Sequence, residues 1–377
     1  MDLSLISETS LAFLGSIIPF LFVLTIVVFF HELGHFYVAR LCGVRVEIFS
    51  VGFGRELLGF TDKHDTRWKF CLIPLGGYVK FLGDDNAASV PDRENRESIS
   101  APDSFHSKSV GQRAAIVSAG PIANFILAIV IYAVLFASFG KPITLALVDQ
   151  VQPASAAQEA GFEPGDLIVQ INSRKIESFA DVTRIVEQSA DLELSIIVER
   201  NNEEITLIAR PRLREKTGPF GGKTRVGLLG IGSSGAAQFR EIKRYDPLTA
   251  TWMAVNETYN VIDATLGYLG AVIAGRQSAD QLGGPIRIAQ ISGQAASLGF
   301  LVLINLAAVL SISIGLINLF PIPMLDGGHL MFFAFEAVRG RPLSETVQNI
   351  GFRVGLGLVL MLMIFATWND LVHLEIF

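Results

Sequence analysis

Two histidines and a glutamate stand together at the end of a long uncharged run. His31, Glu32 and His35 form the pattern H-E-x-x-H within the stretch FFHELGHFYVAR. On a helix, residues four apart share one face, so both imidazoles can bind one metal ion while Glu32 lies beside it. Neutral imidazoles favour zinc, and a neighbouring carboxylate can act as general base toward a water molecule. The pattern therefore predicts a hydrolytic zinc centre with Glu32 as its base.

A catalytic zinc site takes three protein ligands and a water molecule, so one more ligand is required. The residues after the motif, FYVAR, exclude the spacing that supplies a third histidine in metzincins. Glu47 and Glu56 are local candidates, and Asp326 and His329 are remote ones in the stretch NLFPIPMLDGGH. The prolines before Asp326 and the glycines after it are typical of a stiff turn that aims one carboxylate, although a plain turn at a helix end has the same composition. The residues alone leave the third ligand open.

The composition indicates a membrane protein. The chain has 377 residues, of which 50% are hydrophobic and 18% charged, and its mean hydropathy is +0.46. Soluble domains carry about 25% charged residues. The net charge of -6 argues against a nucleic-acid partner, which would require a basic face. Cys42 and Cys71 do not form a C-x-x-C pair, which excludes a disulfide framework and a structural zinc knuckle.

Four segments are apolar enough to cross a bilayer, which takes about 20 residues. Uncharged runs cover 11–30, 114–139 and 299–320, and a shorter run at 354–368 reaches spanning length by including 349–352. The first run has no basic residues before it and no cleavage site after it, so it is not a signal peptide. We therefore predict a polytopic α-helical membrane protein with about four transmembrane helices, embedded in a lipid bilayer.

The distribution of basic residues predicts the orientation. Residues 1–39 contain no Lys or Arg, and Arg40 and Arg45 follow the first span. Arg339 and Arg341 lie between the third and fourth spans. The positive-inside rule then predicts both termini outside and the 41–113 loop in the cytoplasm. The first and third spans both end at the inner face, so H-E-x-x-H and Asp326 are expected at one depth near the cytoplasmic face.

The outer loop between the second and third spans has room for a folded domain. The stretches VQINSRKI and LELSIIVER predict strands, and SFADVTRIVEQSA predicts a helix with a serine cap. The stretch AGFEPGDLIVQINS resembles the tight turn and core strand of PDZ domains in bacterial proteases. We expect an α+β PDZ-like domain over 145–232 on the outer side, where a peptide C-terminus is the expected ligand. An amphipathic outer-surface segment follows at 233–298.

The cytoplasmic loop contains β-rich segments that are expected to return to the membrane. VGFG and RWKFCLIPLGGYVKF predict strands, and the polar residues 83–104 predict a mobile stretch. A strand edge there could pair with an unwound substrate, or the strands could only pack among the helices. The candidate substrate-binding residues are Gly52, Phe53, Gly54, Gly76 and Gly77.

The predicted organisation follows from these patterns. It comprises a first transmembrane helix at 1–40, a cytoplasmic loop at 41–113, a second transmembrane helix at 114–139, a PDZ-like domain at 145–232, a surface segment at 233–298, a third transmembrane helix at 299–328 and a fourth at 347–368.

HELGH together with N-x-x-P-x-P-x-L-D-G-G resembles the site-2 protease family of intramembrane zinc metalloproteases. The regulator-of-sigma-E protease branch is the closest likeness, and VGFGREL, IPLGGYVK and AGPIANF support it. The resemblance implies His31, His35 and Asp326 as ligands of one Zn²⁺ per chain and Glu32 as general base. It also implies that Asn318 positions substrate or stabilises the oxyanion. The chain departs from that branch, whose members often carry two tandem PDZ domains, by having room for one.

The resemblance further implies an endopeptidase of the bacterial inner membrane with a periplasmic PDZ-like domain. Its expected substrates are single-span membrane proteins, such as anti-sigma factors or remnant signal peptides, that another protease has already trimmed. Two other hypotheses remain at this point. One is a PDZ-type membrane scaffold with a degenerate metal site. The other is a membrane-anchored zinc protease that acts on soluble substrates, with Glu47 or Glu56 as a ligand.

Overall fold

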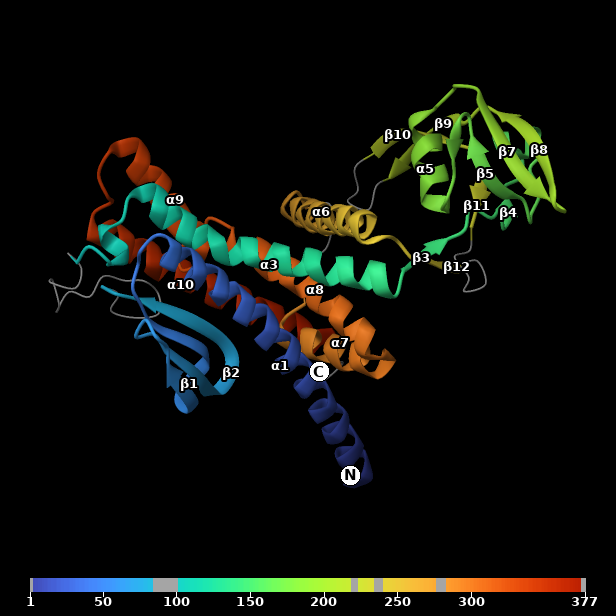
Figure 1. Ribbon diagram of the computed structural model, residues 1–377. Coiled ribbons are helices and arrows are strands. Elements are labelled where there is room, and N and C mark those ends of the chain that lie inside the picture. Colours follow the sequence, from blue (N-terminus) through green and yellow to red (C-terminus); the bar gives the residue numbers. More distant parts are fainter. Residues whose placement is uncertain (1–2, 84–100, 218–222, 234–239, 276–282, 374–377) are drawn as a thin grey trace. The chain divides into compact units, whose positions relative to one another are not determined.

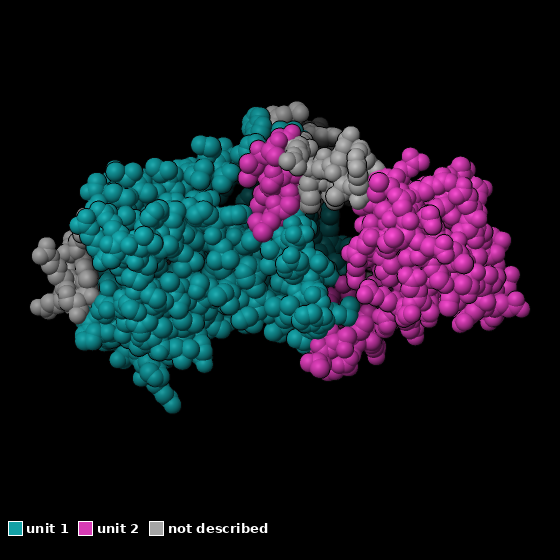
Figure 2. Space-filling model, turned by 90° about the horizontal axis from the view of Figure 1, so that it is seen from above, with its two compact units in different colours: residues 1–133, 251–265, 279–377 teal, residues 134–250, 266–278 magenta. Residues whose placement is uncertain are grey.

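The computed structural model describes residues 3–83, 101–217, 223–233, 240–275 and 283–373 (Figure 1). The chain forms two compact units, which Figure 2 distinguishes by colour. The first contains residues 1–133, 251–265 and 279–377, and the second contains residues 134–250 and 266–278. The predicted mobile stretch 83–104 lies mostly outside the described residues.

Four helices of the described chain are long and apolar enough to cross a membrane, as the sequence predicts. They are α1 (Leu3–Leu41), α3 (Val110–Ser138), α8 (Phe300–Asn318) and α10 (Glu345–His373). Their apolar side chains face outward over long stretches, because in lipid an exposed leucine carries no penalty while every backbone polar group must be bonded within the helix. These four helices are consistent with the predicted polytopic helical membrane protein.

The third of these helices ends earlier than the predicted end at residue 328. Helix α8 ends at Asn318, and residues 319–325 form a turn before α9 (Asp326–Arg339) begins. Two prolines cause the break, because proline lacks the amide hydrogen that the helix requires and disfavours helical geometry in the residue before it. Met324 has a φ of 90°, which is unusual for a residue other than glycine. The predicted range 299–328 therefore contains a helix, a turn and the start of a second helix.

The segment predicted to be amphipathic, 233–298, contains two helices. These are α6 (Pro247–Ile273) and α7 (Pro285–Leu298), and neither is among the candidate spans. Helix α7 packs against α1, α8 and α10. Its first residues donate hydrogen bonds from the amides of Gly284, Ile286 and Arg287 to the buried carboxylate of Asp370 in α10. This carboxylate therefore caps α7 from a distant part of the chain.

A small sheet packs against α1 in the first unit. Strand β1 (Val46–Thr61) pairs antiparallel with β2 (Arg67–Phe81), and β1 is used twice. Its first part, 46–51, pairs both with 77–81 and with 67–70, while its last part pairs with 67–71. Phe49 is fully buried at the centre of the cluster that joins the sheet to α1 and α3. Apolar side chains are exposed around the sheet at Phe53, Leu57, Leu58, Phe60, Phe70, Leu72, Ile73 and Leu75.

The second unit has an α+β core, and the predicted strands and helix are present in it. Its four-stranded sheet has the order β6-β5-β7-β8, and α5 (Phe179–Gln188) carries a capping box with Ser178. Gly165 has a φ of 100° in the turn before β5, where glycine is favoured. Asp166 is fully buried and its Oδ1 lies 2.6 Å from Nε of Arg200. The sheet strands are β5 (Leu167–Ile171), β6 (Arg174–Lys175), β7 (Leu194–Arg200) and β8 (Glu203–Ala209).

Short elements complete the described part of both units. They are η1 (Phe105–Ser107), β3 (Lys141–Thr144), β4 (Gln150–Val151), α4 (Ala156–Glu159), β9 (Arg212–Thr217), β10 (Lys223–Leu228), β11 (Ile231–Gly232) and β12 (Arg240–Lys243). Strand β9 pairs with β10, β4 with β11 and β3 with β12.

Candidate metal centre

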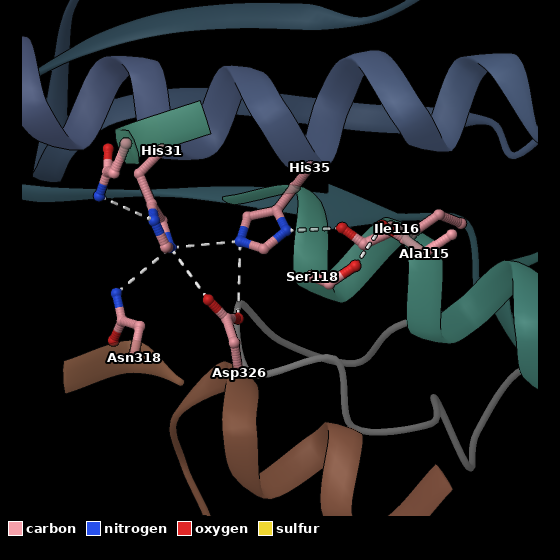
Figure 3. A network of polar contacts seen from close by, with 8 residues as sticks. His31, His35, Ala115, Ile116, Ser118, Asn318 and Asp326 are labelled. Carbon is pink, nitrogen blue, oxygen red and sulfur yellow. Dashed lines mark hydrogen bonds and ion pairs between the residues drawn. The ribbon is translucent and has the colours of Figure 1, made fainter. Parts of the chain in front are cut away.

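Three side chains that can bind a metal converge in the first unit (Figure 3). Nε2 of His31 lies 3.2 Å from Oδ2 of Asp326, and Nε2 of His35 lies 3.5 Å from Oδ1 of the same carboxylate. The two Nε2 atoms are 3.2 Å apart. One ligand atom from each residue lies within 4.8 Å of the others. The histidines and the remote aspartate are thus in one place.

The local structure explains how these side chains meet. His31 and His35 are one turn apart on α1, and both are buried. Asp326 is the first residue of α9, so the turn that ends α8 decides where its carboxylate points. That turn folds closely over the start of α9. A Cβ on Gly327 would lie 2.3 Å from the carbonyl oxygen of Leu319, so only glycine fits there.

The other candidates for the third ligand are engaged elsewhere or lie outside the cluster. Glu47 forms an ion pair with Lys80 at 3.3 Å, and Glu56 forms one with Arg67. Both glutamates belong to β1 and neither joins the cluster. His329 lines the same cavity as the cluster without belonging to it. The geometry therefore favours Asp326 over the three alternatives.

The imidazole of His35 is oriented by helix α3. Its Nδ1 donates a hydrogen bond of 2.9 Å to the carbonyl oxygen of Ile116, as Figure 3 shows. This leaves a lone pair on Nε2, which faces the cluster. Gly120 of the same helix lies against the ring, because a Cβ there would be 2.3 Å from Nε2 of His35. Helix α3 can approach the histidines this closely only because residue 120 has no side chain.

The residues present fit a zinc ion. Two imidazole nitrogens and one carboxylate oxygen form a donor set that zinc commonly takes in catalytic sites. Oδ2 of Asp326 is buried and has no hydrogen-bond partner among the described residues. A buried carboxylate oxygen without a donor is costly unless a cation binds it. The lone pairs that converge here repel one another, and a bound metal ion would offset that repulsion.

Glu32 lies beside the cluster in a cavity of about 290 Å³. The backbone amide of Val79 lies near its carboxylate. Strand β2 comes close at this point, because a Cβ on Gly77 would lie 3.1 Å from Cγ of Glu32. Glu32 is therefore held near the cluster by a strand and not by the ligands alone. The cavity is lined by His31, Glu32, His35, Gly76, Gly77, Tyr78, Val79, Asn318, Asp326 and several apolar side chains.

The predicted substrate-binding residues fall into two groups. Gly76 and Gly77 line the cavity. Gly52, Phe53 and Gly54 do not line it, although the Phe53 ring lies so close to Gly76 that a Cβ there would be 2.6 Å from it. This ring also stacks on Tyr78 with 6.0 Å between the ring centroids. The Phe53 side chain thus supports one wall of the cavity from behind.

Asn318 lines the same cavity as the histidines. Its Nδ2 lies 3.5 Å from Nε2 of His31, and the residue lines the cavity at the last turn of α8. Sequence reasoning missed the contribution of α3, whose stretch AGPIANF counted only as support for a family resemblance. The signal available was an asparagine at position 124, in the middle of an uncharged span. Such a residue is expensive in lipid unless it has a partner.

The chain resembles known metalloproteases over most of its length. Residues 19–362 match the profile described as Peptidase family M50. Metalloprotease MmpA of Caulobacter vibrioides is 42% identical over an alignment of 392 residues. The alignment covers 97% of this chain and 98% of that protein. A protein of Rhizobium meliloti, named as a candidate zinc metalloprotease, is 49% identical over 355 residues and covers 93% of this chain and 95% of its own length. A similarly named protein of Agrobacterium fabrum is 50% identical over 361 residues, with 95% and 96% covered.

Proposed function

The chain belongs to peptidase family M50, the site-2 type of zinc metalloprotease, and we propose that it cuts membrane-embedded proteins within or near the bilayer. The observation that carries this proposal is the convergence of His31, His35 and Asp326 beside Glu32 in one cavity of the membrane-spanning unit. The proposed metal ligands are these two histidines and the aspartate, with one Zn²⁺ per chain.

The chemistry of the site is hydrolysis of a peptide bond. Bound zinc supplies a Lewis acid for the scissile carbonyl and a water molecule of lowered pKa. Glu32, which lies beside the ligands, would take a proton from the attacking water and deliver it to the leaving amine. Asn318 reaches the same cavity with an amide that can donate to the carbonyl oxygen of the substrate as negative charge develops.

The substrate must present an extended backbone, because a helix hides its carbonyl groups in internal hydrogen bonds. Residues 77–81 of β2 run along the cavity, and the pairing described for them comes from β1 on one side. We expect a substrate strand to add along this stretch. A photo-crosslinking residue at Tyr78 should then capture substrate, whereas one at Phe60, which belongs to the opposite end of the sheet, should not. Equal capture at both positions would contradict strand addition at the cavity.

The catalytic assignment is tested with three variants of the full-length protein in detergent or vesicles. Glu32→Gln should retain zinc and lose cleavage by roughly 10²–10⁴-fold, because a general base contributes about that much. Asp326→Ala should lose zinc as measured by metal content. Glu56→Gln is the matched control, since this glutamate pairs with Arg67 outside the cavity, and it should retain zinc. If zinc were retained in Asp326→Ala and lost in Glu56→Gln, the third ligand would be Glu56 of β1 and not Asp326.

The proposed substrates are single-span membrane proteins that another protease has trimmed, such as anti-sigma factors or remnant signal peptides. Family membership and the position of the site among helices that could span a membrane support this class. Co-expression of the wild type or Glu32→Gln, followed by mass spectrometry of membrane fragments, should reveal proteins that accumulate uncut only with the variant. If no membrane-anchored fragment differs between the two strains, the substrate class is wrong.

The proposed location is the bacterial inner membrane, with both termini outside and the active site near the cytoplasmic face. The basic residues after α1, such as Arg40 and Arg45, support this orientation. The α+β unit at 145–232 would then be periplasmic, where a PDZ-like fold could bind the C-terminus of a trimmed substrate. Labelling of single cysteines placed at 201 and at 64 with an impermeant reagent on intact cells tests this. Label is expected at 201 only, and label at 64 only would reverse the topology.

A further inference from the structure

A buried amide of α3 lies against the ligand His31. Asn124 of α3 is fully buried, and its Nδ2 lies 3.3 Å from Nδ1 of His31. Its Oδ1 is also buried and has no hydrogen-bond partner among the described residues. A buried amide oxygen left without a donor is destabilising. The arrangement of this side chain therefore needs an explanation.

The orientation with Nδ2 toward His31 conflicts with metal binding. An amide nitrogen can only donate, so Nδ1 of the imidazole would have to accept and the ring proton would sit on Nε2. That is the nitrogen which lies 3.2 Å from Oδ2 of Asp326 and 3.2 Å from Nε2 of His35. A protonated Nε2 has no lone pair to offer a metal. With this amide orientation the ring would present the wrong tautomer to the centre.

Rotation of the amide by half a turn gives the oxygen a donor and gives the imidazole the tautomer that a metal requires. The oxygen and nitrogen of an asparagine side chain have nearly the same shape, so they are assigned from the hydrogen bonds they make. With Oδ1 toward His31, the oxygen accepts from Nδ1–H and gains the partner that it lacks. The ring then presents the lone pair of Nε2 to the cluster. We propose that Asn124 is a positioning residue for the metal ligand His31, an inference that rests on the metal site proposed above.

The backbone around Asn124 is held firmly enough for this role. Oγ of Ser311 in α8 donates a hydrogen bond of 2.8 Å to its carbonyl oxygen. Gly315 lies one turn further along α8, and a Cβ there would be 3.2 Å from Cβ of Asn124. Helices α3 and α8 are therefore in close contact at this residue. The amide has little freedom to leave the imidazole.

One face of α3 serves both histidines. Ile116, Gly120 and Asn124 follow one another at intervals of four residues, which places them on the same face of a helix. The carbonyl oxygen of Ile116 accepts from Nδ1 of His35. With Oδ1 turned toward the ring, the amide of Asn124 does the same for His31, whose Nδ1 it contacts. Gly120 makes room for the two rings between them. Helix α3 thus selects the tautomer of both imidazoles while contributing no ligand itself.

The experiment compares substitutions that differ only in what residue 124 can accept. Asn124→Asp provides acceptors and no donor, whereas Asn124→Leu keeps the approximate shape and provides neither. Metal affinity is measured by chelator competition with Zn²⁺, and the absorption spectrum of Co²⁺-loaded protein reports the ligand geometry. We expect Asn124→Leu to bind zinc about 10–100-fold more weakly, as is typical for loss of a group that orients a ligand. Asn124→Asp should retain wild-type affinity and the wild-type cobalt spectrum.

Two controls separate this inference from folding and from the metal site itself. Thr258→Val removes another buried polar group, a hydroxyl bonded to the carbonyl oxygen of Ala254 in α6, and should leave zinc affinity unchanged. If Asn124→Leu fails to fold, Asn124→Asp still decides, because weak zinc binding in a folded Asp variant would overturn the acceptor role. Unchanged affinity in Asn124→Leu would overturn it as well. Zinc retained in His31→Ala would instead disprove the proposed metal site.

Discussion

A single methyl group at residue 120 should disable the metal centre. In Gly120→Ala the new Cβ would lie 2.3 Å from Nε2 and 2.5 Å from Cε1 of His35, and 2.9 Å from Cε1 of His31. Ordinary contacts between such atoms are about 3.5 Å or longer. The ring of His35 would therefore have to move by roughly 1 Å. It cannot do so freely, because its Nδ1 is bonded to the carbonyl oxygen of Ile116.

The magnitude follows from that displacement. A shift of about 1 Å in a reacting group can cost about 10²-fold in rate, and disturbing a ligand's support typically costs 10–100-fold in metal affinity. Overpacking adds about 1–3 kcal/mol of destabilisation. Alanine is a better helix former than glycine by about 1 kcal/mol in water, which offsets part of this loss. We therefore expect a folded protein with weak zinc binding and little cleavage.

The assay is zinc affinity by chelator competition together with cleavage of a membrane substrate in vesicles. Gly111→Ala is the matched control, because this glycine lies on the same helix and a Cβ there meets no atom within 4 Å. It should leave both measurements unchanged. Wild-type zinc affinity and cleavage in Gly120→Ala would refute the idea that α3 packs directly on the ligand rings.

Three further perturbations test the frame around the site. Asp370→Ala removes the carboxylate that caps α7 with three hydrogen bonds. It should lower the free energy of unfolding by about 1–3 kcal/mol and with it the melting temperature. An unchanged melting temperature would contradict the capping role. Arg113→Met breaks an ion pair of 2.7 Å with Glu336, both side chains being 13% exposed. It should lower the free energy of unfolding in detergent by about 3 kcal/mol, because Glu336 is left without its partner. Adding Glu336→Gln to the same chain should restore part of this loss. Burial raises the pKa of Asp62, but hydrogen bonds from two backbone amides, an indole and a guanidinium outweigh it and hold the pKa below its usual range. The stability that Asp62 contributes is therefore present above its unfolded pKa of about 3.9 and lost as pH falls through the lower folded pKa. The stability gap between wild type and Asp62→Asn, measured by urea unfolding, should be constant near neutral pH and narrow below about pH 4.

The sequence predicted those features that depend on neighbours along the chain. An uncharged run of spanning length forms a helix whether it faces lipid or packs against other helices, because its backbone must satisfy its own hydrogen bonds. Ser178 caps the helix that begins after it, and the turn at Gly165 precedes a core strand as predicted. The motif at 31–35 places both histidines on one face of α1 for the same local reason. Such signals act within one or two turns, so they survive whatever the rest of the chain does.

The third ligand was accessible only in part. The spacing of the spans predicted that Asp326 and H-E-x-x-H share a depth in the membrane, but depth does not determine which helices are neighbours. The sequence pattern predicted one helix over 299–328, whereas the helix ends at Asn318. It is this break that turns the carboxylate of Asp326 toward α1. Without packing information, Glu47 and Glu56 remained as alternative ligands.

The chain by itself therefore determined the spans, the placement of the two histidines and Glu32 on one helix, and the capped helix of the second unit. Only the tertiary structure decided that Asp326 completes the cluster and that α3 supports it through Gly120 and Asn124. The physical reason is that these contacts join segments far apart in the chain, where the fit between helix surfaces sets the distances. A glycine in an apolar span has no partner that can be read from its neighbours. The requirement for glycine at position 120 is evident only in the tertiary structure, where the His35 imidazole occupies the space that a side chain would need.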